Sequence, residues 1–468
     1  MKNLLCGVFG GEMSREGEKS MDQSFMKTKK VVPLVASMAL PMALSMLVNA
    51  LYNIVDSFFI AQISEKAMTA LSLIFPLQNV TTAVGVGLGV GTNAAVAFFL
   101  GGERKQEAQR AASAALLLSL VNTAILMAVL LPMTGRFLRQ FTADAQVLDY
   151  GVRYGRIVFV TVFVGQAGLV YEKLFQAVGR VRISMASMMA GCIANMILDP
   201  VMIFGIGPCP AMGIEGAAAA TVIGQALSLA VYLVLDARGF LGIGMSLRTG
   251  VRGLDLAGRI YRVGVPVMLS CALPSVMITV MNAILAACSA SGVLILGVYY
   301  KLQTFIYLSA NGIVQGIRPL VAYNYGARLP KRVKAISRTA LVMSAAVMAA
   351  GTAVCLLFPA QLMGMFTDNK ETIREGAGAL RVISAGFIVS SVSVTMCGVL
   401  EGLGFGTWSF VINLMRYVVL ILPAAFILSR FFGSAGVWNA FWVAEAASAA
   451  VAAWMYRKAA ARMERTAA

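Results

Sequence analysis

The sequence of 468 residues contains no histidine, and its seven cysteines are scattered without the paired spacing of a metal site. Zinc and haem centres depend on histidine and on closely spaced cysteine ligands, so neither is expected here. The chain also has no paired-acid motif of the DDxxD type and no arrangement that would activate a nucleophile. An enzymatic function therefore has nothing specific in its favour.

Charge is scarce as well. Charged residues make up 13% of the chain and hydrophobic residues 59%, whereas a soluble domain usually carries about 25% charged residues. Apolar runs of about 20 residues, enough to cross a bilayer core of about 30 Å as helix, recur along almost the whole chain. They are rich in Gly and Ala and do not alternate, which favours helices over outer-membrane strands. The prediction is an all-α integral membrane fold.

We predict twelve transmembrane helices, with ends uncertain by several residues. Their approximate spans are 33–62, 68–99, 112–134, 155–177, 183–206, 214–236, 260–288, 293–323, 339–360, 379–400, 409–431 and 435–456.

The net charge of +17 also suits a nucleic-acid binder, but its distribution argues for a membrane protein. Basic residues cluster before the first span, after the second, fourth, sixth and eighth spans and at the C-terminus, which is the positive-inside pattern. Both termini are therefore expected in the cytoplasm, with the protein in a bacterial inner (plasma) membrane. The connection 135–156 fits less well, because it should be external yet carries four arginines. No cleavable signal peptide is evident, and Met13, Met21 or Met26 are alternative starts.

An internal repeat appears when the chain is aligned on itself with position 41 against position 266. This offset pairs Pro41 with Pro266, Gln78 with Gln303, and Phe141-Thr142 with Phe366-Thr367. Because each half holds an even number of spans, the halves are parallel repeats, and two such bundles enclose a central cavity. The expected organisation is a cytoplasmic tail, a first lobe, a cytoplasmic linker, a second lobe and a cytoplasmic tail, over residues 1–30, 31–237, 238–259, 260–457 and 458–468.

Several motifs are those of a known family. The first half contains "NMILDPVMIFG" and "GIEGAAAATVIGQ", and the second contains "QGIRPLVAYNYGA" and "RYVVLILPAAFIL". With these motifs the chain resembles the multidrug and toxic compound extrusion (MATE) family, most of all its MepA-like bacterial branch, from about residue 33 to 457. The resemblance implies a cation-coupled antiporter of two six-helix lobes that exports amphiphilic, often cationic, drugs by alternating access.

Acidic residues inside the spans are candidates for coupling, because a charge there costs about 2.5–3.5 kcal/mol on insertion scales. Asp56, Asp199 and Thr221 each lie about 6 or 7 residues from the external end of their spans, hence at one depth. Asn195 precedes Asp199 by one helical turn. Two carboxylates, an amide and a hydroxyl suit a Na⁺ site or a pair of carboxyls that holds a proton. Helix capping or interhelical hydrogen bonding is the structural alternative.

The resemblance implies that Asp56, Asn195, Asp199 and Thr221 form the cation site of the first lobe. It also implies a glutamate in the seventh span of many members, where this chain has Pro274. The second lobe therefore departs from the family pattern, and coupling by H⁺ or Na⁺ is expected in the first lobe, without other cofactors.

Five other residues are assigned to the substrate cavity or to a helix bend. Gln78 and Gln303 could line the substrate cavity or join helices, and Arg416 with Glu445 could form a buried ion pair that also attracts cationic drugs. Pro41 lacks the N–H of a helical bond, so the first span can bend there as a gate.

Two further acids, Glu172 and Glu401, lie near cytoplasmic helix ends. A solvated or Arg-paired carboxylate is expected at both positions.

The expected partners are small amphiphilic molecules and the lipid bilayer, with no nucleic acid, and the protein is expected to work as a monomer. The runner-up function is a flippase for a lipid-linked precursor, as in related members of the superfamily. A flippase would place cationic residues inside its cavity, whereas the basic residues here crowd the loops. A pure scaffold would not need acids at one depth inside the membrane.

Overall fold

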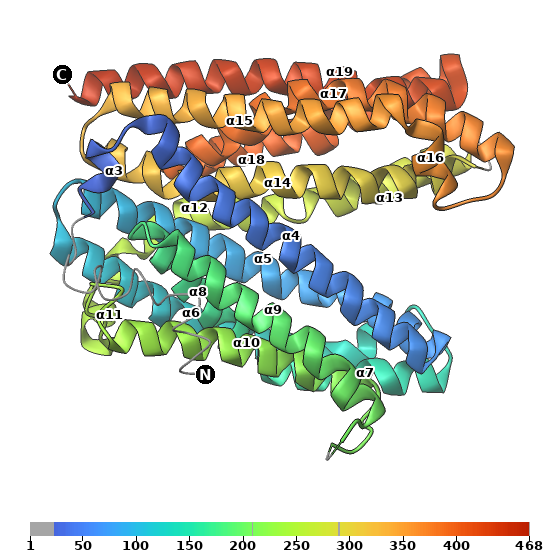
Figure 1. Ribbon diagram of the computed structural model, residues 1–468, viewed down its shortest axis with the longest axis horizontal. Coiled ribbons are helices and arrows are strands. Elements are labelled where there is room, and N and C mark those ends of the chain that lie inside the picture. Colours follow the sequence, from blue (N-terminus) through green and yellow to red (C-terminus); the bar gives the residue numbers. More distant parts are fainter. Residues whose placement is uncertain (1–22, 208, 289–290, 468) are drawn as a thin grey trace.

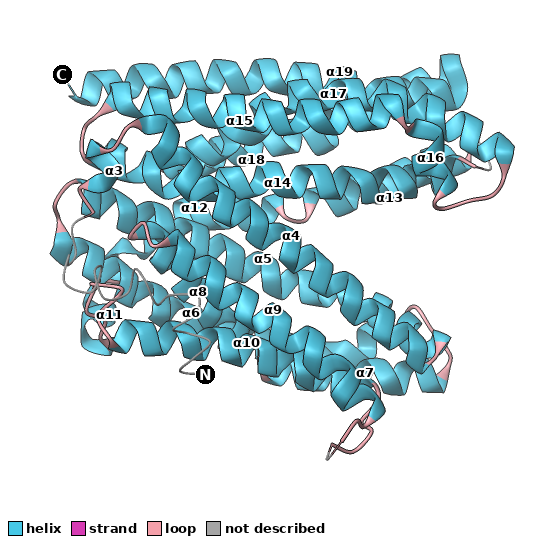
Figure 2. Cartoon of the chain, in the orientation of Figure 1, coloured by secondary structure: helices cyan, strands magenta, loops and turns pink. Residues whose placement is uncertain are grey.

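The computed structural model describes residues 23–207, 209–288 and 291–467, so most of the predicted N-terminal tail, with the alternative starts Met13 and Met21, lies outside the described residues, whereas Met26 is described. Helices are the only regular secondary structure in this described part (Figure 2). They run roughly lengthwise through the molecule and form two bundles (Figure 1). The predicted all-α fold is confirmed.

The short helix α3 (Phe25–Thr28) precedes the first bundle. The first bundle contains α4 (Val31–Ile63), α5 (Glu65–Gly101), α6 (Lys105–Arg139), α7 (Ala145–Val160), α8 (Val162–Ala177), α9 (Val181–Phe204) and α10 (Ile214–Ala237). The connection holds α11 (Leu247–Arg252) and η1 (Leu254–Leu256). The second bundle contains α12 (Ala257–Ser270), α13 (Leu273–Ala286), α14 (Gly292–Gly326), α15 (Pro330–Leu357), α16 (Pro359–Gly364), α17 (Lys370–Gly402), α18 (Gly406–Leu414), η2 (Met415–Leu420) and α19 (Ile421–Ala467).

The twelve predicted spans are all present. Ten helical stretches are long and apolar enough to cross a membrane, and α7 with α8 make one more span bent by 48°. The stretch Gly406–Arg465 counts once among the ten but holds two spans, because Gly433 (φ 57°, ψ −139°) breaks α19. A left-handed backbone of this kind favours glycine, which has no Cβ to clash. The observed helices extend beyond the predicted spans at several ends, as for 105–139 against 112–134.

The repeat extends to individual hydrogen bonds. Asp144 caps the start of α7, and Asn369, its counterpart in the repeat, caps the start of α17; each side chain accepts two hydrogen bonds from backbone N–H groups of the first turn. Their own N–H groups donate to Thr142 Oγ1 (3.1 Å) and Thr367 Oγ1 (3.3 Å), respectively. Such N-caps satisfy N–H groups that have no partner within the helix. The same capping sequence therefore folds in the same way in both halves.

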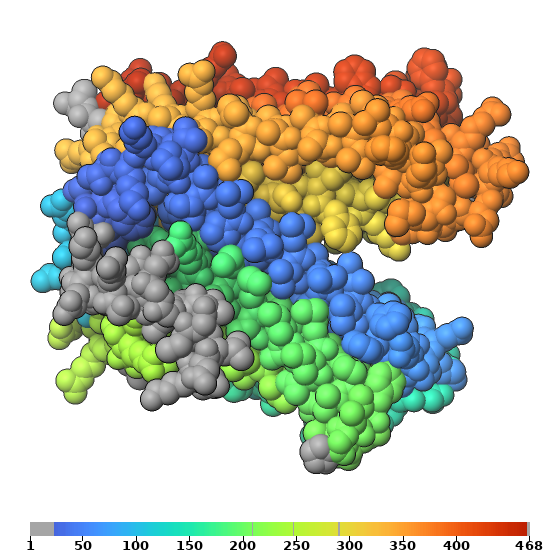
Figure 3. Space-filling model, in the orientation of Figure 1, coloured from blue at the N-terminus to red at the C-terminus, as the bar shows by residue number. Residues whose placement is uncertain are grey.

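The two bundles form a V. They meet at the end that holds α3 and the C-terminal end of α19, which we name the closed end (Figure 1). At the other end, near α7 and α16, the space-filling view shows a wide cleft between them (Figure 3). The bundles touch through α4 against α14 and through α5 against α12 and α14. The structure is thus open on the side away from the C-terminus.

The contact at the closed end is reciprocal. A Cβ atom on Gly101 would lie 1.9 Å from the carbonyl oxygen of Tyr323, and one on Gly326 would lie 1.9 Å from that of Phe98. The two glycines are counterparts in the repeat, and so are the two residues that supply the carbonyls. Only residues without a side chain let two helix backbones approach so closely. The glycines thus permit the tightest packing between the lobes.

Candidate functional site: a buried polar cluster in the first lobe

The structure brings the four residues predicted for the cation site together. We name them the first-lobe polar cluster: Asp56 from α4, Asn195 and Asp199 from α9, and Thr221 from α10. Asp199 is 0% exposed, Asn195 2% and Asp56 8%, although all three are strongly polar. Buried polar side chains without an adequate partner are costly, so this concentration calls for a chemical reason.

Close packing of α9 against α10 creates the cluster. A Cβ on Gly224 would lie 2.7 Å from the carbonyl oxygen of Gly191 and 3.1 Å from Asn195 Cβ. With the helices this near, Asn195 Nδ2 reaches Thr221 Oγ1 at 3.5 Å, at the limit of a hydrogen bond, and donates to Asp199 Oδ1 at 3.2 Å. One amide thus connects the acid of its own helix to the hydroxyl of the next.

The cluster leaves three oxygens without a partner. Within the described part of the chain, Asp56 Oδ1, Asp199 Oδ2 and Asn195 Oδ1 are buried and accept no hydrogen bond. The carboxylates of Asp56 and Asp199 are also close enough to repel each other electrostatically. A hard cation such as Na⁺ prefers oxygen ligands of this kind, and a proton shared by two carboxyls would relieve the same repulsion. The four residues therefore fit either Na⁺ or H⁺ as the transported ion.

Sequence reasoning missed two tyrosines beside these acids. Tyr52 lies one turn before Asp56 on α4, and the buried Tyr154 of α7 lies near the same acids. Tyr154 also accepts a hydrogen bond from Gln78 Nε2 at 3.3 Å. The spacing of four residues between Tyr52 and Asp56 was a usable signal, because such pairs share a helix face. No sequence pattern around Tyr154 predicts that this residue lies near Asp56 of α4.

In the second lobe the predicted ion pair is present. Arg416 Nη2 lies 2.6 Å from Glu445 Oε1 and also donates to the hydroxyl of Tyr307 at 2.9 Å. Tyr307 in turn donates to Ser390 Oγ at 2.6 Å. Arg416 belongs to the π-helical turn η2, a rare widening of the helix that is common at functional sites. A fixed guanidinium thus accompanies the acid of this lobe.

Gln303, the repeat counterpart of Gln78, lies on α14 and is half-buried. It makes no hydrogen bond to any other described residue and does not join the network around Arg416. Pro41 lies inside α4, which continues through it from Val31 to Ile63.

Of the two alternatives expected at Glu172 and Glu401, a solvated carboxylate is wrong for both, and an Arg-paired one is confirmed at Glu401. Glu401 is 6% exposed and accepts from Arg318 Nη2 at 2.6 Å, so only the Arg-paired alternative holds for it. Glu172, 8% exposed, pairs with Lys173 at 2.6 Å. Lys173 Nζ also donates to Gln315 Oε1 of the other lobe at 2.7 Å. Both acids are near helix ends in sequence, but their side chains are buried in the structure.

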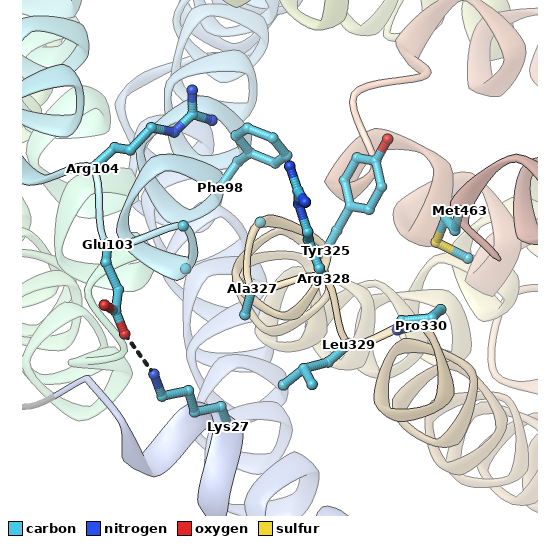
Figure 4. A pocket seen from close by; sticks show the side chains of 13 residues that line it. Lys27, Phe98, Glu103, Arg104, Tyr325, Ala327, Arg328, Leu329, Pro330 and Met463 are labelled. Carbon is cyan, nitrogen blue, oxygen red and sulfur yellow. Dashed lines mark hydrogen bonds and ion pairs between the residues drawn. The ribbon is translucent and has the colours of Figure 1, made fainter. Parts of the chain in front are cut away.

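A separate cavity lies at the closed end. It measures about 700 Å³ and is lined by the turns that follow α5 and α14, with Lys27 of α3 and Met463 of α19 (Figure 4). Lys27 Nζ bonds Glu103 Oε1 at 2.9 Å, which holds the pKa of that carboxyl below its usual range. None of the first-lobe polar cluster lines this cavity. The candidate site is therefore the first-lobe polar cluster, whose buried oxygens are suited to bind a cation, and not this cavity.

Comparison with known proteins gives one consistent result. The model of the MatE family matches residues 41–201 and 266–427. "Multidrug export protein MepA" of Staphylococcus haemolyticus (strain JCSC1435) is 25% identical over 429 residues, which cover 92% of this chain and 94% of the relative. The protein of the same name from Staphylococcus aureus (strain NCTC 8325 / PS 47) is 22% identical over the same shares.

Solved structures share the fold. The "outward-facing conformation of a multidrug resistance MATE family transporter of the MOP superfamily" has a TM-score of 0.88 at 22% identity, covering 95% of this chain and 99% of that one. A MOP superfamily transporter from Pyrococcus furiosus Vc1 (DSM3638) gives the same values. With the family model matching both repeats, the chain belongs to the MatE family, whose members are membrane transporters rather than enzymes.

Proposed function

We propose that the protein exports amphiphilic, often cationic, drugs and other toxic compounds in exchange for H⁺ or Na⁺ by alternating access. The observation that carries the proposal is the first-lobe polar cluster, where two buried carboxylates have oxygens without a partner. The names of the curated relatives, multidrug export proteins, support the substrate class. The V-shaped cleft between the lobes supports the transport mode (Figure 3).

In this proposal the coupling ion enters from outside and binds the first-lobe polar cluster. The positive-inside pattern puts the closed end and both termini in the cytoplasm, so the cleft of this state faces outward. The protein then lies in a bacterial plasma membrane and works as a monomer, without a cofactor. Its two lobes are residues 31–237 and 260–457, joined by the linker 238–259.

Helix α4 links ion binding to the contact between the lobes. It carries Asp56 at the polar cluster and also packs its backbone on the other lobe, since a Cβ on Gly312 would lie 2.3 Å from Ala43 Cα. Pro41 lies beside that contact and about 22 Å along the helix from Asp56, at 1.5 Å per residue. When an ion neutralises Asp56, the preferred packing of α4 around the polar cluster changes. A bend of α4 at Pro41 then transmits this change to its contact with the other lobe near the closed end.

The substrate surface is proposed from composition and from a few polar groups. Twenty-eight methionines and an aromatic content of 9% suit a deformable apolar cavity, because thioethers adapt their shape and rings attract organic cations. Gln78 and Gln303 are offered as cavity polar groups, and Arg416 with Glu445 as a charged pair within reach of a cationic drug.

The test is ethidium efflux from proteoliposomes under an imposed Na⁺ gradient or an imposed pH gradient. One gradient should drive efflux by the wild type, and Asp199→Asn should abolish it. Asp149→Asn removes an exposed acid of the same lobe and should transport normally. If neither gradient drives efflux, or Asp199→Asn matches the wild type, the coupling proposal fails and the flippase for a lipid-linked precursor becomes the better candidate.

A further inference from the structure

A second groove lies on the second lobe near the closed end, away from the polar cluster. Its volume is about 340 Å³, and it runs between α15 and α19 with α17 at its floor. We name it the second-lobe groove. It is lined by Lys334, Ser337, Arg338 and Leu341 of α15, Val392 and Met396 of α17, and Ala453, Tyr456 and Arg457 of α19. No residue of the first lobe is among these lining residues.

The rim of the groove is basic. Lys334, Arg338 and Arg457 line it, and Lys334 already pairs with Glu464 at 2.5 Å. Arg338 and Arg457 are exposed, and neither has an acidic or hydrogen-bonding partner among the residues that the structure describes. Two guanidiniums therefore remain available on opposite walls, and guanidinium groups bind phosphate well through paired N–H donors.

The floor of the groove is apolar and lies deeper. On α15, Leu341 follows Lys334 by seven residues, or about 10 Å along the helix. Met396 and Val392 lie about 6 and 10 residues from the end of α17 at Gly402. The groove thus changes from charged to apolar along the helix axes, as a phospholipid does from its phosphate to its acyl chains.

An aromatic residue marks the level of the membrane interface beside the groove. Trp454 follows the groove residue Ala453 and is 59% exposed, with Lys458 Nζ 5.2 Å from its ring centroid. Tryptophan gathers where hydrocarbon meets headgroups, and lysine there directs its charge outward. The basic rim, at residue 457 on the same helix, therefore lies at headgroup depth.

From these observations we infer that the second-lobe groove binds an anionic phospholipid, with its phosphate on Arg338 and Arg457 and an acyl chain along Leu341, Val392 and Ala453. Basic pockets between helices on the cytoplasmic side are the sites that anionic headgroups occupy. A soluble phosphate would use the rim but leave the apolar floor exposed. The inference does not depend on which ion or drug the protein transports.

The experiment is native mass spectrometry of the full-length protein in detergent, titrated with phosphatidylglycerol or with phosphatidylcholine of the same chain length. The wild type should retain phosphatidylglycerol preferentially. Arg338→Gln/Arg457→Gln should weaken that retention roughly 30-fold, at about tenfold or less for each charge removed. Arg238→Gln/Arg248→Gln removes two exposed arginines from the connection between the lobes and should keep wild-type retention.

Two further arms separate a lipid site from a simple anion site. Ala453→Phe fills the floor without changing charge and should lower retention, while Arg338→Lys/Arg457→Lys should retain most of it. Glycerol 3-phosphate, which has the anionic group but no chain, should not displace the lipid. Equal losses in both arginine-to-glutamine variants would overturn the inference as a general charge effect. Displacement by glycerol 3-phosphate, or normal retention in Ala453→Phe, would overturn it as an anion site without a lipid.

Discussion

The two lobes are related by an internal repeat, but the first-lobe polar cluster and the Glu445 site of the second lobe hold their buried acids in opposite ways. The first holds Asp56 and Asp199 with no basic residue in hydrogen-bond contact among the described residues, and three oxygens of its cluster have no partner. The second holds Glu445 against Arg416, which forms 2.6 Å and 2.9 Å contacts to the same carboxylate oxygen. On the proposal above, the first-lobe polar cluster binds a mobile cation, whereas Glu445 already has a covalently attached one.

This difference suggests a division of labour. An acid whose partner is a side chain of the same lobe has no reason to exchange ions with water. An acid pair without such a partner changes its preferred packing each time an ion arrives or leaves. On this view the first lobe responds to the ion and the second provides a rigid counterpart.

Removing the fixed cation should have the largest effect. Arg416→Met leaves the Glu445 carboxylate buried without its partner, which should lower the free energy of unfolding by about 3–5 kcal/mol. Arg416→Met/Glu445→Gln should recover most of that loss, because no charge then remains. The measurement is denaturation of the purified protein in detergent. A single variant as stable as the wild type would mean that Glu445 is solvated, and the contrast between the lobes would disappear.

Removing the acids of the first lobe should act on ion dependence rather than on folding. The wild type should be stabilised by its coupling ion, by about 2.7 kcal/mol when the ion is present at 100 times its Kd. Asp56→Asn/Asp199→Asn should fold normally and lose this stabilisation, whether Na⁺ or low pH supplies it. Thermal unfolding across a series of Na⁺ concentrations and pH values measures it. If the ion stabilised the variant as much as the wild type, the ion would bind outside the first-lobe polar cluster.

Changes at the contact between the lobes should be symmetric, in contrast to those at the charged sites. Gly101→Ala and Gly326→Ala each put a methyl group 1.9 Å from a backbone oxygen of the other lobe. Overpacking of this kind usually costs about 1–3 kcal/mol. The two variants should therefore lose similar stability in the same denaturation experiment, and both should transport poorly. If one of the two variants had wild-type stability and transport, the closed end would not be packed equally tightly on both sides.

The smallest expected effect concerns the two helix caps. The Lys66 ammonium, with two backbone N–H groups, holds the pKa of Asp144 below its usual range. Its contribution to stability is therefore present above pH about 4, near the unfolded value, and is lost as the pH falls through the lower folded pKa. Asn369, the counterpart in the second lobe, does not titrate. Amide hydrogen exchange should show the first turn of α7 opening in acid while that of α17 keeps its protection; equal behaviour in acid would contradict the assignment.

Much of this molecule was predictable because the bilayer imposes simple rules on sequence. Helix length and apolar composition predicted twelve spans, and the internal repeat predicted two parallel halves; the paired caps at Asp144 and Asn369 emerged only from the structure. The depth of Asp56, Asp199 and Thr221 predicted that they could meet, because residues at equal depth on neighbouring helices can touch. The ion pair of Arg416 with Glu445 followed from the cost of leaving either charge alone.

The rest depends on how the lobes dock, which no local pattern encodes. Glu401 and Glu172 look like helix-end acids by sequence distance, yet both are buried. Glu401 pairs with Arg318 of its own lobe, and Lys173, the partner of Glu172, also reaches Gln315 of the other lobe. Tyr154 lies on α7, which is bent relative to α8 by 48°, and the sequence contains no proline at that bend. The second-lobe groove needs three helices from distant parts of the chain.

The reciprocal contact of Gly101 and Gly326 has a consequence for how such a transporter can diversify. Its partners are backbone carbonyls, so no side chain at these positions can be exchanged to adjust the seal between the lobes. Mutations that change which compounds are accepted must accumulate toward the open end of the cleft, where side chains do line the walls. The closed end can then stay constant while the substrate range evolves. Because the two glycines are counterparts in the repeat, duplication of the gene for one lobe supplies both of them at once.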